Sequence, residues 1–134
     1  MTTPVKLLAA LLATGALLVA GCSTSEGTIE TVSPTDAAEV IASDSDVVVL
    51  DIRTPEEYSA GIIEGAINID FYEPDFAAQL DTLDKDTHYV VYCRSGSRSG
   101  QAMGVFADLA FAEVTEVDGG IANWYGTGLP VVAP

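Results

Sequence analysis

Two short, uninterrupted apolar runs constrain the fold of this chain more than any other feature of its sequence. The first, VVVLDIR at residues 47–53, ends in charged residues, and the second, HYVVYC at residues 88–93, leads directly into a polar loop. A strand that is apolar on both faces belongs in a parallel sheet that helices cover on both sides. Both runs are therefore predicted to be buried strands of such a sheet.

Helical patterns alternate with these strands. Ser33 and Thr54 are each followed by proline, which is typical of an N-cap and the first helical residue, and Gly61 terminates the second helix. Two further segments are amphipathic or carry an apolar stripe at helical spacing. Helices are predicted at residues 33–43, 54–61, 73–84 and 97–112.

Shorter β-rich segments complete the alternation. Residues 28–32 are predicted to form an edge strand, and residues 65–70 and 114–120 two more strands, the last closed by a turn. Residues 121–132 are predicted to form a short helical turn and an extended tail. The predicted fold is one α/β domain, a three-layer sandwich in which helices flank a small, mostly parallel sheet.

The N-terminal segment has the pattern of a signal and is not counted in the predicted fold. Met1–Ala20 has one lysine and then an apolar run too short to span a bilayer comfortably, a layout typical of an export signal. Its end, LVAGC, resembles the bacterial lipoprotein signal, which implies cleavage before Cys22 and acylation of the Cys22 thiol. The alternative is an ordinary signal peptide with a cysteine nearby. We expect a signal peptide at 1–21, a flexible tether at 22–28 and a folded domain at 29–134.

The charge of the chain limits its partners. The sequence has 20 acidic and 5 basic residues, a formal net charge of −15. Nucleic acids and anionic lipid surfaces are bound through basic patches, so the composition excludes both as partners held by charge. We expect a monomer that is held at the cell membrane by lipid alone and faces the periplasmic or extracellular side.

Cysteine content raises a question of reactivity. If Cys22 is acylated, Cys93 is the one remaining thiol, and no internal disulfide can form. Free thiols are unusual in exported proteins, so Cys93 is either buried and inert or kept for its reactivity. One cysteine and one histidine, His88, cannot form a zinc site, and His88 is predicted to be a surface residue of its strand.

The loop CRSGSR, residues 93–98, indicates reactivity. A loop between a strand and a helix turns its backbone N–H groups inward as an anion nest, and the helix N-terminus adds partial positive charge. Gly96 lets the loop curl, while Arg94 and Arg98 can donate forked hydrogen bonds to oxyanions. A cysteine at such a site is expected to have a depressed pKa and to be a thiolate at neutral pH.

Three motifs stand out along the chain: LDIRTPEEYSAGIIEGAINI, YCRSGSRS and VDGGIANWYGTGLPV. Together they resemble the rhodanese, or sulfurtransferase, domain over roughly residues 32–131. The resemblance implies that Cys93 accepts sulfur as the nucleophile. It also implies that Asp51 and Arg53 support the loop or core by charge pairing, and that Trp124 packs near the loop. The loop residues implied to bind the substrate are Arg94, Ser95, Gly96, Ser97 and Arg98.

One position departs from the family pattern. The usual Gly-His-Ile is Gly61-Ile62-Ile63 in this chain, from which we expect a local change in packing and no loss of activity.

The implied activity is thiosulfate sulfurtransferase, with a small sulfur-containing anion as donor, a thiol or cyanide as acceptor, and no cofactor or metal. Phosphatase or arsenate-reductase chemistry is the enzymatic alternative. Those relatives use Cys-x5-Arg, whereas Cys93 and Arg98 form Cys-x4-Arg. A non-catalytic sulfur-carrier or binding module remains the other alternative.

Overall fold

A computed structural model describes residue 21 and residues 26–134. The predicted signal peptide up to residue 20, Cys22 and most of the predicted tether lie outside the described residues. The elements in chain order are β1 (Thr28–Val32), α1 (Pro34–Ser43), β2 (Val48–Asp51), α2 (Pro55–Ser59), β3 (Ile67–Asn68), α3 (Phe76–Asp81), β4 (His88–Tyr92), α4 (Ser97–Asp108), β5 (Glu113–Val117) and α5 (Gly120–Gly126).

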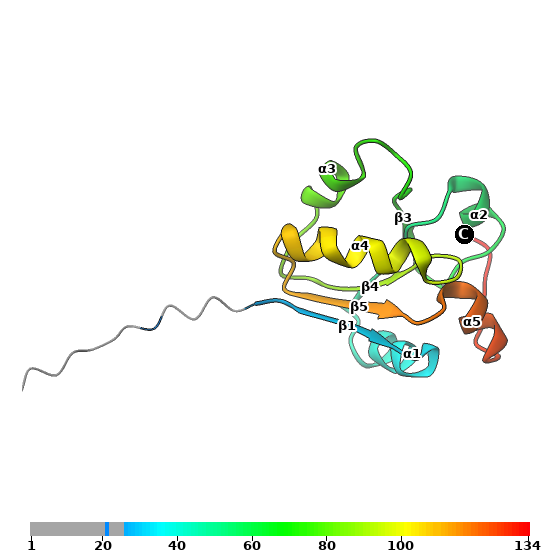
Figure 1. Cartoon of the computed structure of the whole chain (residues 1–134). Helices are drawn as coiled ribbons and strands as arrows, with labels where there is room; N and C mark the ends of the chain where they lie inside the picture. Colours follow the sequence, from blue (N-terminus) through cyan, green and yellow to red (C-terminus); the bar gives the residue numbers. More distant parts are fainter. Residues whose placement is uncertain (1–20, 22–25) are drawn as a thin grey trace, which may run out of the picture.

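The strands form one sheet in the order β1-β5-β4-β2-β3, and every neighbouring pair is parallel. Helices α3 and α4 cover one face of the sheet, and α1 and α5 pack on the other (Figure 1). The prediction of a three-layer α/β sandwich is confirmed. The edge position predicted for residues 28–32 is also confirmed, and this strand begins at Thr28, the last residue of the predicted tether.

Alternating side chains of the central strands fill two cores. Leu50 of β2 and Val91 of β4 face α3 and α4, whereas Val49 and Val90 face α1 and α5, and all four are buried. The two apolar runs are thus buried on both faces, because helices lie on both sides of the sheet.

Two predicted helix starts have side-chain caps. The Ser33 hydroxyl accepts a hydrogen bond from the backbone N–H of Asp36 at 3.2 Å. Thr54 and Glu57 form a capping box, in which each side chain bonds the other residue's backbone N–H. These caps satisfy N–H groups that have no partner within the helix.

Several predicted elements are shorter in the structure. The predicted helix at 97–112 ends at Asp108, because the chain turns at Ala110 with φ of 60°, a conformation that sequence reasoning expects of glycine. The predicted strand at 65–70 is reduced to Ile67–Asn68 at the sheet edge.

The carboxyl ends of the strands hold most of the motif residues. Figure 1 shows α2 and α5 at the end of the sheet toward which the arrows of β1 and β5 point. Ligands of parallel α/β folds bind beyond this end. Among the described residues, no helix is both long and apolar enough to cross a membrane.

Candidate active site

The loop 93–98 connects the end of β4 to the start of α4. Cys93 follows the last residue of β4, and Gly96 is the residue before α4. Gly96 has φ of 97°, a left-handed conformation that strains residues with a side chain, and so it allows the chain to turn into the helix. The loop therefore curls around the cysteine.

The sulfur of Cys93 lies at the N-terminus of α4. Its Sγ accepts hydrogen bonds from the backbone N–H of Gly96 at 3.1 Å and of Ser99 at 3.4 Å, and Cys93 is 1% exposed. Gly96 has no side chain to cap the helix. The sulfur occupies the place of a capping oxygen, where N–H groups and the helix dipole favour negative charge.

Two opposing effects set the pKa of the Cys93 thiol. Burial raises the pKa, but hydrogen bonding with Ser99 and with the backbone N–H groups of Gly96 and Ser95 outweighs burial and holds the pKa below its ordinary value. The direction agrees with the sequence prediction. The main cause differs, since loop N–H groups and Ser99 contribute more than the two arginines.

Arg98 is occupied by an ion pair. Its guanidinium donates to both carboxylate oxygens of Glu57 on α2, at 2.7 and 2.8 Å, and lies over the ring of Tyr72 at 5.3 Å. Hydrogen bonds from Arg98 lower the pKa of Glu57 to about 2, although partial burial opposes this shift. Arg98 therefore ties the start of α4 to α2.

Arg94 differs from Arg98 in its surroundings. It is exposed, and no carboxylate pairs with it within the part of the chain that the structure describes. Its backbone oxygen accepts from the N–H of Ala122, and that of Cys93 accepts from the N–H of Ile121, at 3.0 and 2.9 Å. The backbone of the loop is thus fixed against α5, and the Arg94 side chain is free to meet an anion.

The glycine pair before α5 makes this contact possible. Gly120 has φ of 62°, and a Cβ at this position would lie 2.5 Å from the Cys93 backbone oxygen and 2.7 Å from that of Arg94. A side chain cannot fit there. The motif DGG therefore allows α5 to lie against the loop 93–98.

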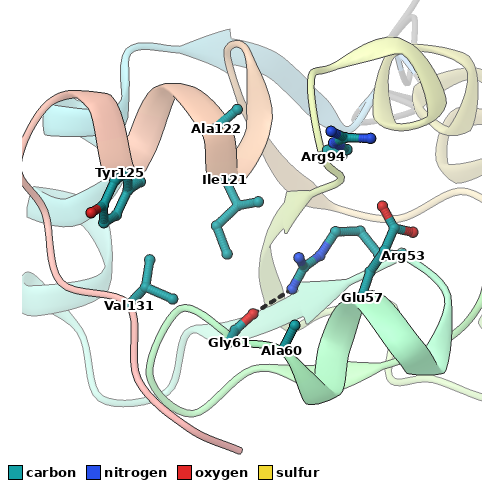
Figure 2. A pocket seen from close by; sticks show the side chains of 9 residues that line it. All are labelled: Arg53, Glu57, Ala60, Gly61, Arg94, Ile121, Ala122, Tyr125 and Val131. Atoms are coloured by element: carbon teal, nitrogen blue, oxygen red, sulfur yellow. Dashed lines mark hydrogen bonds between the residues drawn. The ribbon is translucent and has the colours of Figure 1, made fainter.

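A pocket of about 390 Å³ opens beside the loop. Figure 2 shows the polar side chains of Arg53, Glu57 and Arg94 at one end and apolar or aromatic side chains at the other. The lining residues are Arg53, Glu57, Ala60, Gly61, Arg94, Ile121, Ala122, Tyr125 and Val131. Cys93 is not among the lining residues, but its neighbour Arg94 is.

The remaining motif residues are buried around the site. Asp51, 0% exposed, accepts from Arg53 at 2.6–3.0 Å, and Arg53 also donates to the backbone oxygen of Gly61 at 2.7 Å (Figure 2). Trp124 of α5 is buried in the core on its side of the sheet, and its indole N–H donates to the Pro130 backbone oxygen at 2.9 Å. These contacts connect β2, the segment after α2 and the C-terminal tail.

Two other sequence expectations concern Ile62 and His88. Ile62 is buried and pairs with Val132 of the tail, so the residue in place of the usual histidine is part of the core. His88 is half-buried at the start of β4, with Nε2 2.8 Å from the hydroxyl of Thr115. It lies at the opposite end of β4 from Cys93.

Comparisons with known proteins agree with this site. The family model described as "Rhodanese-like domain" matches residues 33–127. The chain belongs to the rhodanese-like family. It is 37% identical to a protein named "Sulfurtransferase" from Allochromatium vinosum over 70% of this chain and 86% of the relative. It is 34% identical to thiosulfate sulfurtransferase GlpE of Pseudomonas paraeruginosa, over 72% of this chain and 84% of the relative.

Solved structures place this rhodanese-like domain in the same fold. A rhodanese-related protein from Thermoplasma volcanium aligns with a TM-score of 0.68 and 32% identity, over 77% of this chain and 97% of that one. The family and the rhodanese-like fold predicted from the sequence motifs are confirmed, and the chain is a relative of sulfurtransferases.

The rhodanese-like site contains three polar residues that the sequence reasoning missed. Glu57 could have been found from the capping-box pattern Thr-Pro-Glu-Glu, which places an acid three residues after Thr54. Glu116, whose carboxylate accepts from the Ser99 hydroxyl at 2.6 Å, stands out as an acid within the β-rich segment VTEV. Ser99 has no signal of its own, because only the fold brings its N–H and hydroxyl to the sulfur of Cys93.

Proposed function

We propose that this chain is an exported sulfurtransferase that moves sulfane sulfur from a donor anion such as thiosulfate to a thiol, or to cyanide in an assay, through a persulfide on Cys93. The observation that supports this most is the position of Sγ, which accepts two backbone N–H groups at the start of α4. The lowered pKa of the Cys93 thiol favours the thiolate, which is the nucleophile that such a transfer requires.

The proposed reaction has two steps. The Cys93 thiolate attacks the outer sulfur of thiosulfate, the S–S bond of the donor breaks, and sulfite leaves with the electron pair. An acceptor thiolate or cyanide then attacks the outer sulfur of the persulfide, and Cys93 leaves as a thiolate. This is nucleophilic covalent catalysis with ping-pong order, and it consumes no oxidant or reductant besides donor and acceptor.

The loop length supports sulfur transfer over phosphoryl chemistry. Four residues separate Cys93 from Arg98, and the Arg98 guanidinium is held by Glu57. Steady-state formation of thiocyanate from thiosulfate and cyanide tests the proposal, with hydrolysis of a phosphate monoester as the comparison. Thiocyanate formation without phosphate release supports the sulfurtransferase. Phosphate release without thiocyanate contradicts it.

Arg94 is proposed to bind the donor anion. The Arg94→Ala variant is expected to raise KM for thiosulfate about tenfold with little change in kcat, because a hydrogen bond to a charged group contributes about 1.5–3 kcal/mol. Lys85→Ala, which removes a positive charge near the opposite end of β4, is the matched control and should leave KM unchanged. An unchanged KM in Arg94→Ala with a lower melting temperature would assign Arg94 a structural role.

We also propose that Cys22 carries the lipid that holds the domain, as a monomer, at the outer side of a membrane. The wild-type protein is expected in the membrane fraction of cells at high salt, because two or more acyl chains anchor firmly. Cys22→Ala is expected in the soluble fraction. Fractionation that finds both proteins soluble would make Cys22 an ordinary residue of the N-terminal segment.

A further inference from the structure

A buried carboxylate lies behind the catalytic cysteine. Glu116 of β5 is 6% exposed, and its side chain faces α4, the helix that also covers Cys93. One carboxylate oxygen accepts from the Ser99 hydroxyl at 2.6 Å and the other from the Thr31 hydroxyl at 2.7 Å. No lysine or arginine pairs with Glu116 among the residues that the structure describes.

Ser99 connects this carboxylate to the sulfur. The Ser99 Oγ lies 3.4 Å from Cys93 Sγ and 2.6 Å from the Glu116 carboxylate. A hydroxyl has one proton to donate. The bond to Glu116 is the shorter of the two, so the hydroxyl proton points to the carboxylate, and the Ser99 oxygen accepts from the Cys93 thiol. To donate to a Cys93 thiolate, the hydroxyl would have to break its hydrogen bond to Glu116.

The charges around Cys93 thus act from two sides. Backbone N–H groups favour the thiolate, and Arg98, whose charge also interacts with Cys93, is already paired with Glu57. On the other side, the two hydrogen bonds of Ser99 put the Glu116 carboxylate within about 6 Å of Sγ. Two negative charges at that distance repel each other, and one Ser99 proton cannot serve both.

We propose that Glu116 is a positioning residue that acts through Ser99 to disfavour the free Cys93 thiolate and so favours the sulfur-loaded form of the chain. This rests on the proposed sulfurtransferase function. When thiosulfate transfers its outer sulfur, an S–S bond forms to Sγ and sulfite leaves with the electron pair. Sγ becomes neutral, and the negative charge moves to the outer sulfur, one S–S bond of about 2 Å away. Loading therefore relieves the repulsion with Glu116.

The first test measures the thiolate without any sulfur transfer. The rate of Cys93 alkylation by iodoacetamide is followed against pH in the wild type, in Glu116→Gln and in Glu30→Gln. Glutamine keeps the size of the side chain but removes its charge. The midpoint of the profile is expected to fall by about one pH unit in Glu116→Gln, with alkylation about tenfold faster below the midpoint.

Glu30→Gln is the matched control, because Glu30 is an exposed acid on the neighbouring strand β1 and its loss also removes one negative charge. Its profile should match the wild type. An unchanged or higher midpoint in Glu116→Gln overturns the proposal. If Glu116→Gln does not fold, Ser99→Ala decides: a midpoint that rises means that Ser99 donates to the thiolate, which contradicts the proposal, whereas one that stays or falls supports it.

The second test measures loading itself. Purified protein is equilibrated with mixtures of thiosulfate and sulfite, and the persulfide fraction is measured by mass spectrometry. Glu116→Gln is expected to need at least about threefold more thiosulfate relative to sulfite for half-loading. An equal or lower ratio contradicts the proposal. If neither protein forms a persulfide, the sulfurtransferase function fails, while the alkylation profile still decides the effect of Glu116 on the thiolate.

Discussion

Replacing Cys93 by serine is expected to lower thiocyanate formation from thiosulfate and cyanide by at least about a thousandfold. A serine hydroxyl is of similar size and can accept the N–H groups of Gly96 and Ser99 that bond the sulfur. It does not ionise near neutral pH, however, and cannot form the persulfide. The loss should therefore appear in kcat, with the unfolding midpoint close to that of the wild type.

Cys22→Ser is the matched control for this change, since it removes the other cysteine of the chain. Cys22→Ser protein from the soluble fraction is expected to retain the full rate of detergent-solubilised wild type. Near wild-type turnover by Cys93→Ser would show that the transferred sulfur does not pass through this residue.

The second large effect concerns stability. Arg53→Met is expected to lower the free energy of unfolding by about 3–5 kcal/mol, because it leaves the carboxylate of Asp51, which is 0% exposed, without its cation. The variant also removes the donor to the Gly61 backbone oxygen and the guanidinium 5.5 Å from the Tyr92 ring centroid. Urea denaturation of the purified wild type and variant measures this difference in the free energy of unfolding.

Lys85→Met is the comparison for this variant. Lys85 pairs with Asp81 at 3.1 Å on the surface, where an ion pair contributes about 0–1 kcal/mol. If Arg53→Met also lowers the free energy of unfolding by less than about 1 kcal/mol, the buried pair of Arg53 and Asp51 does not stabilise the fold.

The sequence predicted the features of the fold that depend on local pattern. The continuous apolar runs became β2 and β4 because strands buried on both faces need no polar side. Ser33 and Thr54 cap helices because their hydroxyls reach N–H groups within the next turn. The position of Cys93 at the end of β4 also followed from the order of strand, loop and helix.

Features that depend on contacts between distant segments could not be predicted. The ion pair between Arg98 and Glu57 spans 41 residues, and nothing in the loop sequence indicates that Glu57 is the partner of Arg98. The hydrogen bond between Ser99 and Glu116 requires the relative placement of α4 and β5. The end of α4 was misplaced because Ala110 turns the chain without the glycine that normally marks such a turn.

Mass spectrometry of the purified protein after incubation with thiosulfate, without an acceptor, shows whether Cys93 carries the transferred sulfur. We expect one added sulfur on the peptide that contains Cys93, its release by cyanide, and no addition to the Cys93→Ser variant. An unmodified Cys93 peptide at saturating thiosulfate, or a sulfur that cyanide does not remove, would contradict this expectation.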